Sequence, residues 1–155
     1  MRPWLLLIVL VGVWFVLREA GVVGNRFEEP QAVSEQFPLC SGPGYTANCV
    51  VDGDTIRIGE RRIRLNGFDA PEIEGSCQRE RDLALAARER LHRWLALSPF
   101  ELSGGASPPR DQYGRELRAA RRSSADDSVE YLADVMVDAG LARSDVWYEG
   151  GNPWC

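Results

Sequence analysis

Val50-Val51-Asp52-Gly53-Asp54-Thr55-Ile56 joins two β-branched segments through an Asp-Gly-Asp turn. Side chains of an extended backbone alternate between two faces, so Asp52 and Asp54 are predicted to point to the same side. Gly53 lets the chain bend between them. Two carboxylates this close repel each other, and a fold tolerates them when a cation lies beside them. Taken alone, this stretch is also compatible with an ordinary Asp-Gly hairpin turn at the surface.

Two later segments add the residue types of a phosphate-binding site. Ile63-Arg64-Leu65-Asn66-Gly67-Phe68-Asp69-Ala70-Pro71-Glu72 brings one arginine and two carboxylates to the end of a strand-like run. Asp111-Gln112-Tyr113-Gly114-Arg115 supplies a second arginine in a turn. The three motifs, in this order, resemble the staphylococcal nuclease (thermonuclease) family over roughly residues 49–142, and three ordered motifs are more specific than any one of them.

This resemblance implies a fold and an activity. The expected fold is mainly β with helices (α+β), a five-stranded OB-fold-type barrel with two or three packed helices. The expected activity is that of a calcium-dependent phosphodiester endonuclease, which cuts DNA and RNA outside the cytoplasm and leaves 3′-phosphate ends. The expected partners are therefore DNA and RNA substrates, and the protein is expected to be a monomer.

Carboxylates of the first two motifs suit a hard divalent cation. Asp54 and Asp69 are the obvious pair of oxygen ligands. The resemblance makes the ion Ca²⁺, adds the backbone carbonyl of Thr55 as a ligand, and places Asp52 near the metal through water. A simpler role for Asp69 is that of a turn or helix cap before the following proline.

The remaining motif residues suit phosphodiester hydrolysis. By resemblance, Glu72 orients or deprotonates the attacking water, and Pro71 fixes its backbone. Arg64 bridges the phosphate and the metal site, whereas Arg115 stabilises the developing charge or the leaving oxygen. Tyr113 matches a tyrosine of the family that contacts the nucleotide.

Some neighbouring residues do not share these roles. Glu74 is predicted to be an ordinary surface glutamate, which is also the simpler interpretation of Glu72. Arg61 and Arg62 lack a matching motif and are predicted to be solvated. Gln112 stands where a lysine is familiar in the family, which indicates weaker phosphate binding but not a different reaction.

Length and charge limit the function classes. The 155 residues, 45% of them hydrophobic, suffice for one domain with a core. All 18 basic residues are arginine, and the net charge of −5 argues against a strong non-specific grip on nucleic acid. The segment from Ser123 onward contains one arginine and seven acidic residues, so most of the positive charge lies earlier in the chain.

The N-terminus indicates export. Arg2 precedes an unbroken apolar run at 3–17, which is typical of a signal peptide or a membrane anchor. No small-x-small cleavage site follows, so we expect an uncleaved anchor with its N-terminus in the cytoplasm. The expected organisation is an anchor or signal peptide at 1–24, a polar linker at 25–39 and the nuclease-like domain at 40–155. The domain would lie in the cell envelope, facing the periplasm or the exterior, or be secreted after cleavage.

Four cysteines in an exported chain favour disulfides, although four cysteines allow three pairings. The preferred pairs are Cys40 with Cys49, which closes a Gly/Pro-rich loop, and Cys77 with Cys155, which ties the chain end to a helix start. Buried free thiols remain the alternative.

Patterns of apolar residues place the other elements. Strands are expected near 49–51, 55–58, 61–66, 100–102 and 116–122. A helix at about 77–97, capped by Ser76, buries the apolar face that Leu83, Ala87, Leu91, Trp94 and Leu95 make. A second helix is capped by Asp127, with Glu130 completing a capping box, and ends at Gly140.

The main alternative function is non-catalytic. An OB-fold module without catalysis could bind nucleic acid or peptides in the cell envelope. Such a relative is expected to have lost at least one of the five central residues, which are all present: Asp54, Arg64, Asp69, Glu72 and Arg115. A structural protein of the envelope is a third interpretation, suggested only by the N-terminal anchor.

Overall fold

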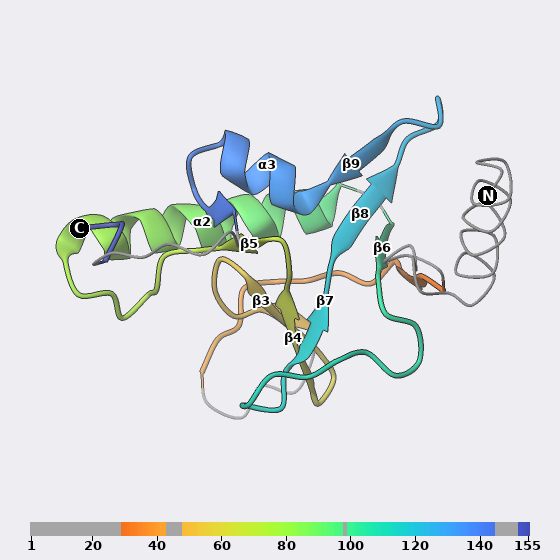
Figure 1. Cartoon of the computed structure of the whole chain (residues 1–155), viewed down its shortest axis with the longest axis horizontal. Helices are drawn as coiled ribbons and strands as arrows, with labels where there is room; N and C mark the ends of the chain where they lie inside the picture. Colours follow the sequence, from red (N-terminus) through yellow and green to blue (C-terminus); the bar gives the residue numbers. More distant parts are fainter. Residues whose placement is uncertain (1–28, 43–47, 98, 145–151) are drawn as a thin grey trace, which may run out of the picture.

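The computed structural model of the chain describes residues 29–42, 48–97, 99–144 and 152–155. It confirms the α+β class: the described part holds helices packed against three open sheets (Figure 1). The predicted anchor at 1–24 lies outside the described residues. Among the described ones, no helix is both long and apolar enough to cross a membrane.

The first four-stranded sheet carries the Asp-Gly-Asp motif. Its strands are β2 (Cys49–Val50), β3 (Thr55–Ile58), β4 (Arg61–Leu65) and β7 (Glu116–Arg118), in the order β2-β3-β4-β7. β3 and β4 form a hairpin whose turn places Gly59 at a φ of 59°, a conformation that favours glycine. β4 pairs with β7 in parallel, so the third motif is brought beside the second.

The second four-stranded sheet continues from the first. Its strands are β1 (Gln31–Val33), β6 (Phe100–Leu102), β8 (Ala120–Ser123) and β9 (Val129–Tyr131), in the order β1-β6-β8-β9. The single strand expected at 116–122 is therefore two strands, β7 and β8, which belong to different sheets. The chain changes sheets at Ala119, whose N–H donates to Ser103 Oγ at 2.7 Å.

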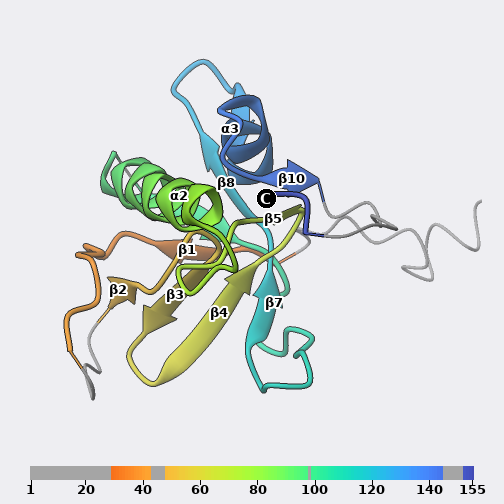
Figure 2. The same ribbon diagram turned by 90° about the vertical axis from the view of Figure 1, so that its left-hand side faces the viewer.

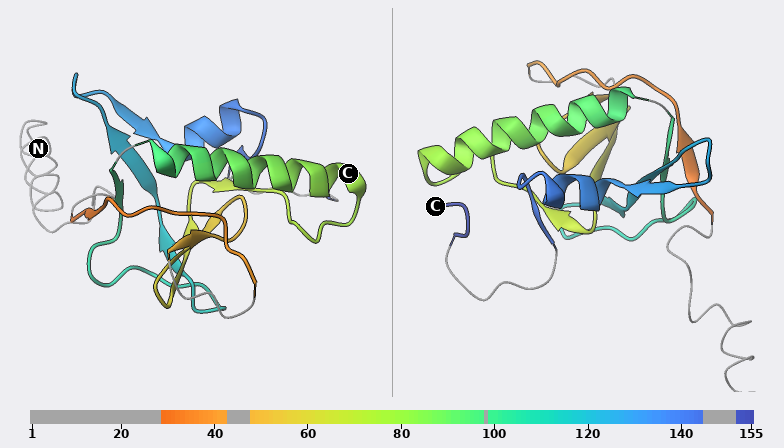
Figure 3. Two further views of the ribbon diagram at one scale, coloured as in Figure 1. Left: turned by 180° about the vertical axis from the view of Figure 1, so that it is seen from behind. Right: turned by 90° about the horizontal axis from the view of Figure 1, so that it is seen from above.

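Two helices and a short ladder complete the described fold. α2 (Gln78–Ala96) lies across the sheets, and α3 (Leu132–Asp138) packs beside it (Figures 1 and 3). Figure 2 looks nearly along α2 and shows the sheet of β3 and β4 on one side of the helix. β5 (Phe68–Asp69) pairs with β10 (Arg143–Ser144) in a two-stranded sheet.

The core forms between α2 and the two larger sheets. Ala87, Leu91, Trp94 and Leu95 are buried as the helical periodicity predicts, and Leu83 is half-buried. They pack in one cluster with apolar side chains from both sheets and from α3, namely Ile56, Ile63, Leu65, Phe100, Leu102, Leu132 and Met136. This packing fixes α2 over β2 and β3, the strands on either side of the Asp-Gly-Asp turn.

The predicted linker at 25–39 is only partly a linker. Gln31–Val33 forms β1 and pairs with β6, and the side chains of Val33 and Phe37 are buried in the core. The stretch looked polar because its apolar residues are few and widely spaced. Val33 and Phe37 nevertheless reach the core through contacts that are distant in sequence, whereas Ala32 and Leu39 are exposed.

The predicted caps of both helices are wrong, although α2 covers nearly the predicted range of 77–97. The N-cap of α2 is Cys77, not Ser76, and no side chain caps it. α3 begins at Leu132, because residues 129–131 pair with β8 as strand β9. Asp127 instead lies in the turn before β9 with a φ of 62°. The carboxylate of Glu130 accepts hydrogen bonds from Trp94 Nε1 at 2.6 Å and Arg122 Nη1 at 3.1 Å, contacts that replace the predicted capping box.

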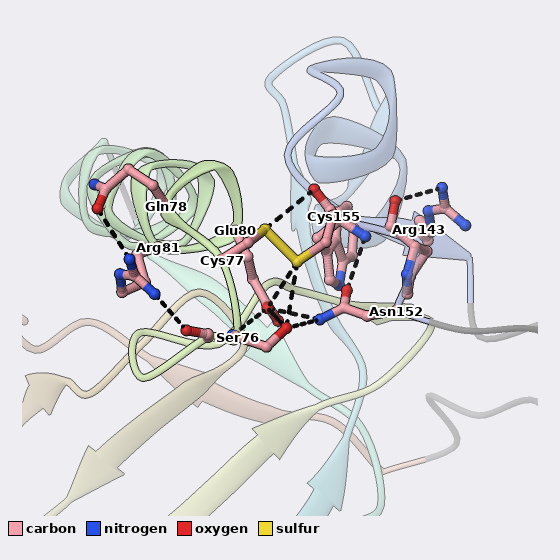
Figure 4. Close-up of a disulfide and its surroundings, with 11 residues drawn as sticks. Ser76, Cys77, Gln78, Glu80, Arg81, Arg143, Asn152 and Cys155 are labelled. Carbon is pink, nitrogen blue, oxygen red and sulfur yellow. Dashed lines mark hydrogen bonds between the residues drawn. A yellow bond between two sulfur atoms is a disulfide. The ribbon is translucent and has the colours of Figure 1, made fainter.

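Both preferred disulfides are confirmed. Cys40 is bonded to Cys49, and Cys77 is bonded to Cys155 (Figure 4). The first closes a short loop before β2. The second joins the N-terminus of α2 to the last residue of the chain.

Candidate functional site

The Asp-Gly-Asp turn is held by its own backbone. The N–H of Val51 donates to the carbonyl of Thr55 at 2.9 Å, and the N–H of Asp52 approaches the same oxygen at 3.4 Å. Asp52 Oδ1 accepts from the N–H of Asp54 at 3.1 Å. The two carboxylates lie close enough that the charge of Asp52 acts on Asp54, although residues 52–54 form a bend and not the extended backbone that was predicted.

Gly53 allows this turn to touch the second motif. A Cβ added at Gly53 would lie 2.8 Å from the Cβ atoms of both Ala70 and Ala87. No side chain fits at that distance, so only glycine lets the turn lie against α2 and the segment that follows Asp69. The three parts of the chain therefore meet through a close backbone approach.

Arg64 lies between two of the predicted metal ligands. Its Nη1 donates to Asp54 Oδ2 at 2.5 Å and its Nη2 donates to Asp69 Oδ1 at 2.7 Å. Asp54 is buried, whereas the side chain of Asp69 is 52% exposed. The guanidinium thus joins the end of β4 to the turn before β3 and to β5, with one carboxylate inside and the other at the surface.

The surroundings of Asp54 disfavour the ionised form of its carboxyl group. Burial, followed by the nearby carboxylate of Asp52, raises the pKa of Asp54 to about 7, although Arg64 and the Thr55 hydroxyl oppose the shift. Asp69 adds a further small increase. An ion pair with one arginine therefore does not neutralise this group of acids, and a second positive charge would stabilise it.

Glu72 belongs to the same electrostatic cluster. Partial burial is the largest cause that raises the pKa of Glu72, and the carboxylates of Asp52 and Asp69 raise it further. Arg64 and Arg115 lower it. Because charges of all three motifs act on Glu72, the three segments converge around it. The residue remains exposed, so its carboxylate can meet a substrate.

Arg115 is oriented by Asp111, a residue whose role the motif reading missed. The Arg115 Nε donates to Asp111 Oδ2 at 2.6 Å, and its backbone N–H donates to Oδ1 at 2.9 Å. Arg115 Nη1 then reaches Thr55 Oγ1 at 3.5 Å. A signal was present, since aspartate at the start of an Asp-x-x-Gly turn accepts backbone N–H bonds.

Tyr113 lies at the outer edge of the site. Its N–H also donates to Asp111, at 2.9 Å, and its side chain is 74% exposed. The Cζ atom of Arg115 is 5.6 Å from the centre of the tyrosine ring. An exposed aromatic ring beside an arginine can stack against a nucleic-acid base.

The backbone carbonyl of Thr55 is poorly suited to the predicted metal role. It already accepts the N–H groups of Val51 and Asp52. The hydroxyl of Thr55 contributes instead: Oγ1 donates to Asp54 Oδ1 at 2.8 Å and lies 3.5 Å from Arg115 Nη1. Thr55 therefore connects the buried acid to the second arginine.

The donor set fits a hard divalent cation. Four carboxylates (Asp52, Asp54, Asp69 and Glu72) act on one another, while two guanidinium groups (Arg64 and Arg115) oppose them. That leaves a formal excess of two negative charges when all are ionised. In the described part of the chain, no three of these acids bring ligand atoms within 4.8 Å of one another. A cation on Asp54 and Asp69 would therefore need further oxygens from carbonyls or water.

Comparisons with known proteins add no independent assignment. None of the models of known protein families matches this sequence, and a search of curated proteins finds no significant relative.

Proposed function

We propose that this protein is a calcium-dependent phosphodiesterase of the thermonuclease type, which cuts DNA and RNA internally and leaves 3′-phosphate ends. The observation that carries the proposal is the convergence of Asp54, Asp69, Arg64, Glu72 and Arg115 from three distant segments. The choice of calcium and of the product end follows from the family resemblance.

The acids would bind the metal ion and activate water, and the arginines would stabilise the transition state. A Ca²⁺ ion on Asp54 and Asp69 would offset the charge of the phosphate and polarise a phosphoryl oxygen. Glu72, with its raised pKa, would accept the proton of the attacking water more readily than an ordinary glutamate. As the P–O5′ bond breaks, the 5′ oxygen takes up a proton and the phosphate stays on the 3′ side.

Arg64 and Arg115 would stabilise the charge that grows on the phosphoryl oxygens. Arg115 is pre-oriented, because Asp111 holds both its backbone and its Nε, which leaves the Nη groups toward the site. Preorganised donors of this kind typically contribute a factor of about 10² to 10³ to turnover. Arg64 lies directly between the two proposed metal ligands and can bridge phosphate and metal site.

We also propose that the two larger sheets are the halves of an OB-type barrel. β7 and β8 are consecutive and run from one sheet into the other, because β7 pairs with β4 in the first sheet and β8 pairs with β6 in the second. On the other side, Leu39 forms a parallel bridge with Val50, so the segment after β1 touches β2. With β7 and β8 counted as one bent strand, the two larger sheets hold seven strands around one core, and the five strands of the expected barrel would be part of these.

The test is digestion of supercoiled plasmid and of an RNA by the purified 155-residue chain. With CaCl₂ we expect nicked and then linear DNA, and RNA fragments; with a chelator we expect none. The new ends should resist polymerase extension until a phosphatase removes the 3′-phosphate. Cleavage that persists with chelator would contradict the metal role.

The same experiment separates the alternative function. An OB-fold binding module would retard DNA, RNA or a peptide in a binding assay and leave nucleic acids intact at every calcium concentration. Binding without cleavage would therefore replace the nuclease by a binding module in the cell envelope. The proposed location there, with attachment through the N-terminal segment, is tested separately by cell fractionation.

A further inference from the structure

The last residues of the chain lie against the loop that follows Glu72 (Figure 4). Cys155 is bonded to Cys77 at the N-terminus of α2. Asn152 Nδ2 donates to Ser76 Oγ at 2.8 Å and to Glu80 Oε2 at 2.7 Å. Residues 152–155, called here the C-terminal strap, are therefore joined to this loop by a covalent bond and by hydrogen bonds.

Glu80 connects the strap to the loop. Its side chain is buried, and Oε2 accepts from the N–H of Ser76 at 2.7 Å and from Ser76 Oγ at 3.2 Å. A Cβ added at Gly75 would lie within 2.4 to 2.7 Å of the Glu80 side-chain atoms. Although burial opposes it, hydrogen bonds from Asn152 and Ser76 lower the pKa of Glu80, so its carboxylate is charged at neutral pH.

The loop held by Glu80 is the one that directs Glu72. The N–H of Gly75 donates to the carbonyl of Glu72 at 2.9 Å, which closes a turn. The carbonyl of Gly75 accepts from Arg81 Nη1 at 2.8 Å. The turn that carries Glu72 is thus fixed to the first turn of α2 through its far end, at Gly75 and Ser76.

The strap also contacts β10, the strand that pairs with the one that carries Asp69. Trp154 is buried, and the Cζ of Arg143 lies 5.2 Å from the centre of its ring. Arg143 Nη2 donates to the carbonyl of Pro153 at 3.2 Å. In the β5–β10 ladder, Arg143 is the partner of Asp69. The strap therefore contacts the loop after Glu72 directly and reaches the Asp69 strand through Arg143.

We propose that the C-terminal strap positions Glu72 for catalysis, with Glu80 and Asn152 as positioning residues and the Cys77–Cys155 disulfide as the covalent tie. This inference rests on the proposed nuclease function. A general base must be held to within a fraction of an ångström, and a misplacement of about 1 Å can cost about 100-fold in rate. The loop at 72–77 has no regular secondary structure of its own, so the strap and α2 supply that constraint.

The experiment compares two variants of the full chain, each of which lacks one of the two disulfides. Cys77→Ser/Cys155→Ser removes the tie, while serine can still cap α2. Cys40→Ser/Cys49→Ser removes the other disulfide and is the matched control. With calcium, we expect the strap variant to lose about 10- to 100-fold in kcat while KM stays within about twofold. The control should keep both values, at a temperature where circular dichroism shows every variant folded.

Three further measurements separate a positioning role from a purely structural one. In the control variant only the strap disulfide can be reduced by dithiothreitol, so kcat should fall on reduction and return on reoxidation. Asn152→Ala keeps the disulfide and should lower kcat by about threefold to tenfold. Without calcium, hydrogen exchange of the Gly75 and Ser76 amides should be faster in the strap variant than in wild type, while exchange in β3 and β4 should be equal.

Each result decides one of the two proposals. Faster exchange in the loop with a lower kcat supports the strap. Unchanged exchange, or faster exchange with an unchanged kcat, overturns it. A wild-type chain that cuts neither DNA nor RNA overturns the nuclease function and the catalytic role of the strap together, and the exchange data then show separately whether the strap orders the loop.

Discussion

Two clusters of carboxylates and arginines meet at the start of β7, and they differ in balance. Arg115 joins the candidate site, where burial and neighbouring acids raise the pKa of Asp54 to about 7. The next residue, Glu116, joins a second cluster, in which Arg61, Arg118 and Arg110 all donate to its carboxylate. There, a hydrogen bond from Arg61, aided by Arg118, lowers the pKa of Glu116 to about 2.

The two clusters differ in whether the fold neutralises the charge of the acid. Around Glu116, one buried acid meets three arginines, so every lone pair is used and the charge is stabilised within the fold. Around Asp54, acids outnumber arginines, so the fold leaves an excess of negative charge that a bound cation can neutralise. Arg61 was predicted to be solvated, but it belongs to the Glu116 cluster, and its side chain is only 35% exposed.

The largest effect should come from the candidate site. We expect Glu72→Ala and Arg115→Ala each to lower the rate of DNA cleavage by about 10² to 10³ while the fold survives, because both act on charge in the transition state. The rates are measured with calcium, and circular dichroism checks the fold. Glu74→Ala, at an exposed neighbour outside the cluster, is the control and should cut at the wild-type rate. Normal rates for the first two variants would end the assignment.

In the Glu116 cluster, we expect a substitution to lower stability and to leave activity almost unchanged. Glu116→Gln should lower the free energy of unfolding by about 3 kcal/mol at pH 7, because three guanidinium groups lose a buried counter-charge. Activity per folded molecule should change little. Urea denaturation and active-site titration measure the two quantities separately.

The pH dependence of this stabilisation has a definite sign. Because the pKa of Glu116 is lower in the folded state, its contribution is complete above the ordinary value of 4.5 and is lost as the pH falls toward about 2. The stability difference between wild type and Glu116→Gln should therefore shrink between pH 5 and pH 2. A constant difference over that range would show that the ion pairs do not cause it.

Gly53→Ala tests whether the candidate site around Asp54 depends on close contact between the Asp-Gly-Asp turn and its neighbours. A methyl group 2.8 Å from the Cβ atoms of Ala70 and Ala87 must push the turn away, at a cost of roughly 2 kcal/mol in stability and with a loss of cleavage. Adding Ala87→Gly removes one of the two clashes. The double variant should be more stable than the sum of the two single effects predicts, and strict additivity would contradict the contact.

The smallest effect should be a gain in stability. Burial raises the pKa of Asp54 above the unfolded value of 3.8, so the stability tied to its neutral form is complete below that pH and is lost as the pH rises through about 7. Without calcium at pH 8, Asp54→Asn should therefore be about 1 kcal/mol more stable than wild type, after allowing for the lost ion pair with Arg64. Calorimetry should show that the variant no longer binds calcium. A destabilised Asp54→Asn would mean that the acid is fully compensated within the fold.

Local patterns were sufficient for much of the fold. Alternating residues placed β3 and β4, helical spacing placed α2 and its buried face, and the turn-rich loop indicated the pair Cys40 with Cys49. These features depend on neighbours a few residues away, which the sequence displays directly. The predicted start of α3 was wrong because β9 pairs with β8 and Glu130 is taken by Trp94 and Arg122.

The sequence by itself determined which residue types stand in the candidate site and in what order they occur. The tertiary structure alone decided that Arg64 lies between Asp54 and Asp69, that the Thr55 carbonyl is taken by the turn, and that Glu80 joins the chain end to the loop of Glu72. The reason is physical: composition and spacing set local backbone preferences, whereas burial and the balance of charge arise only when distant segments pack together.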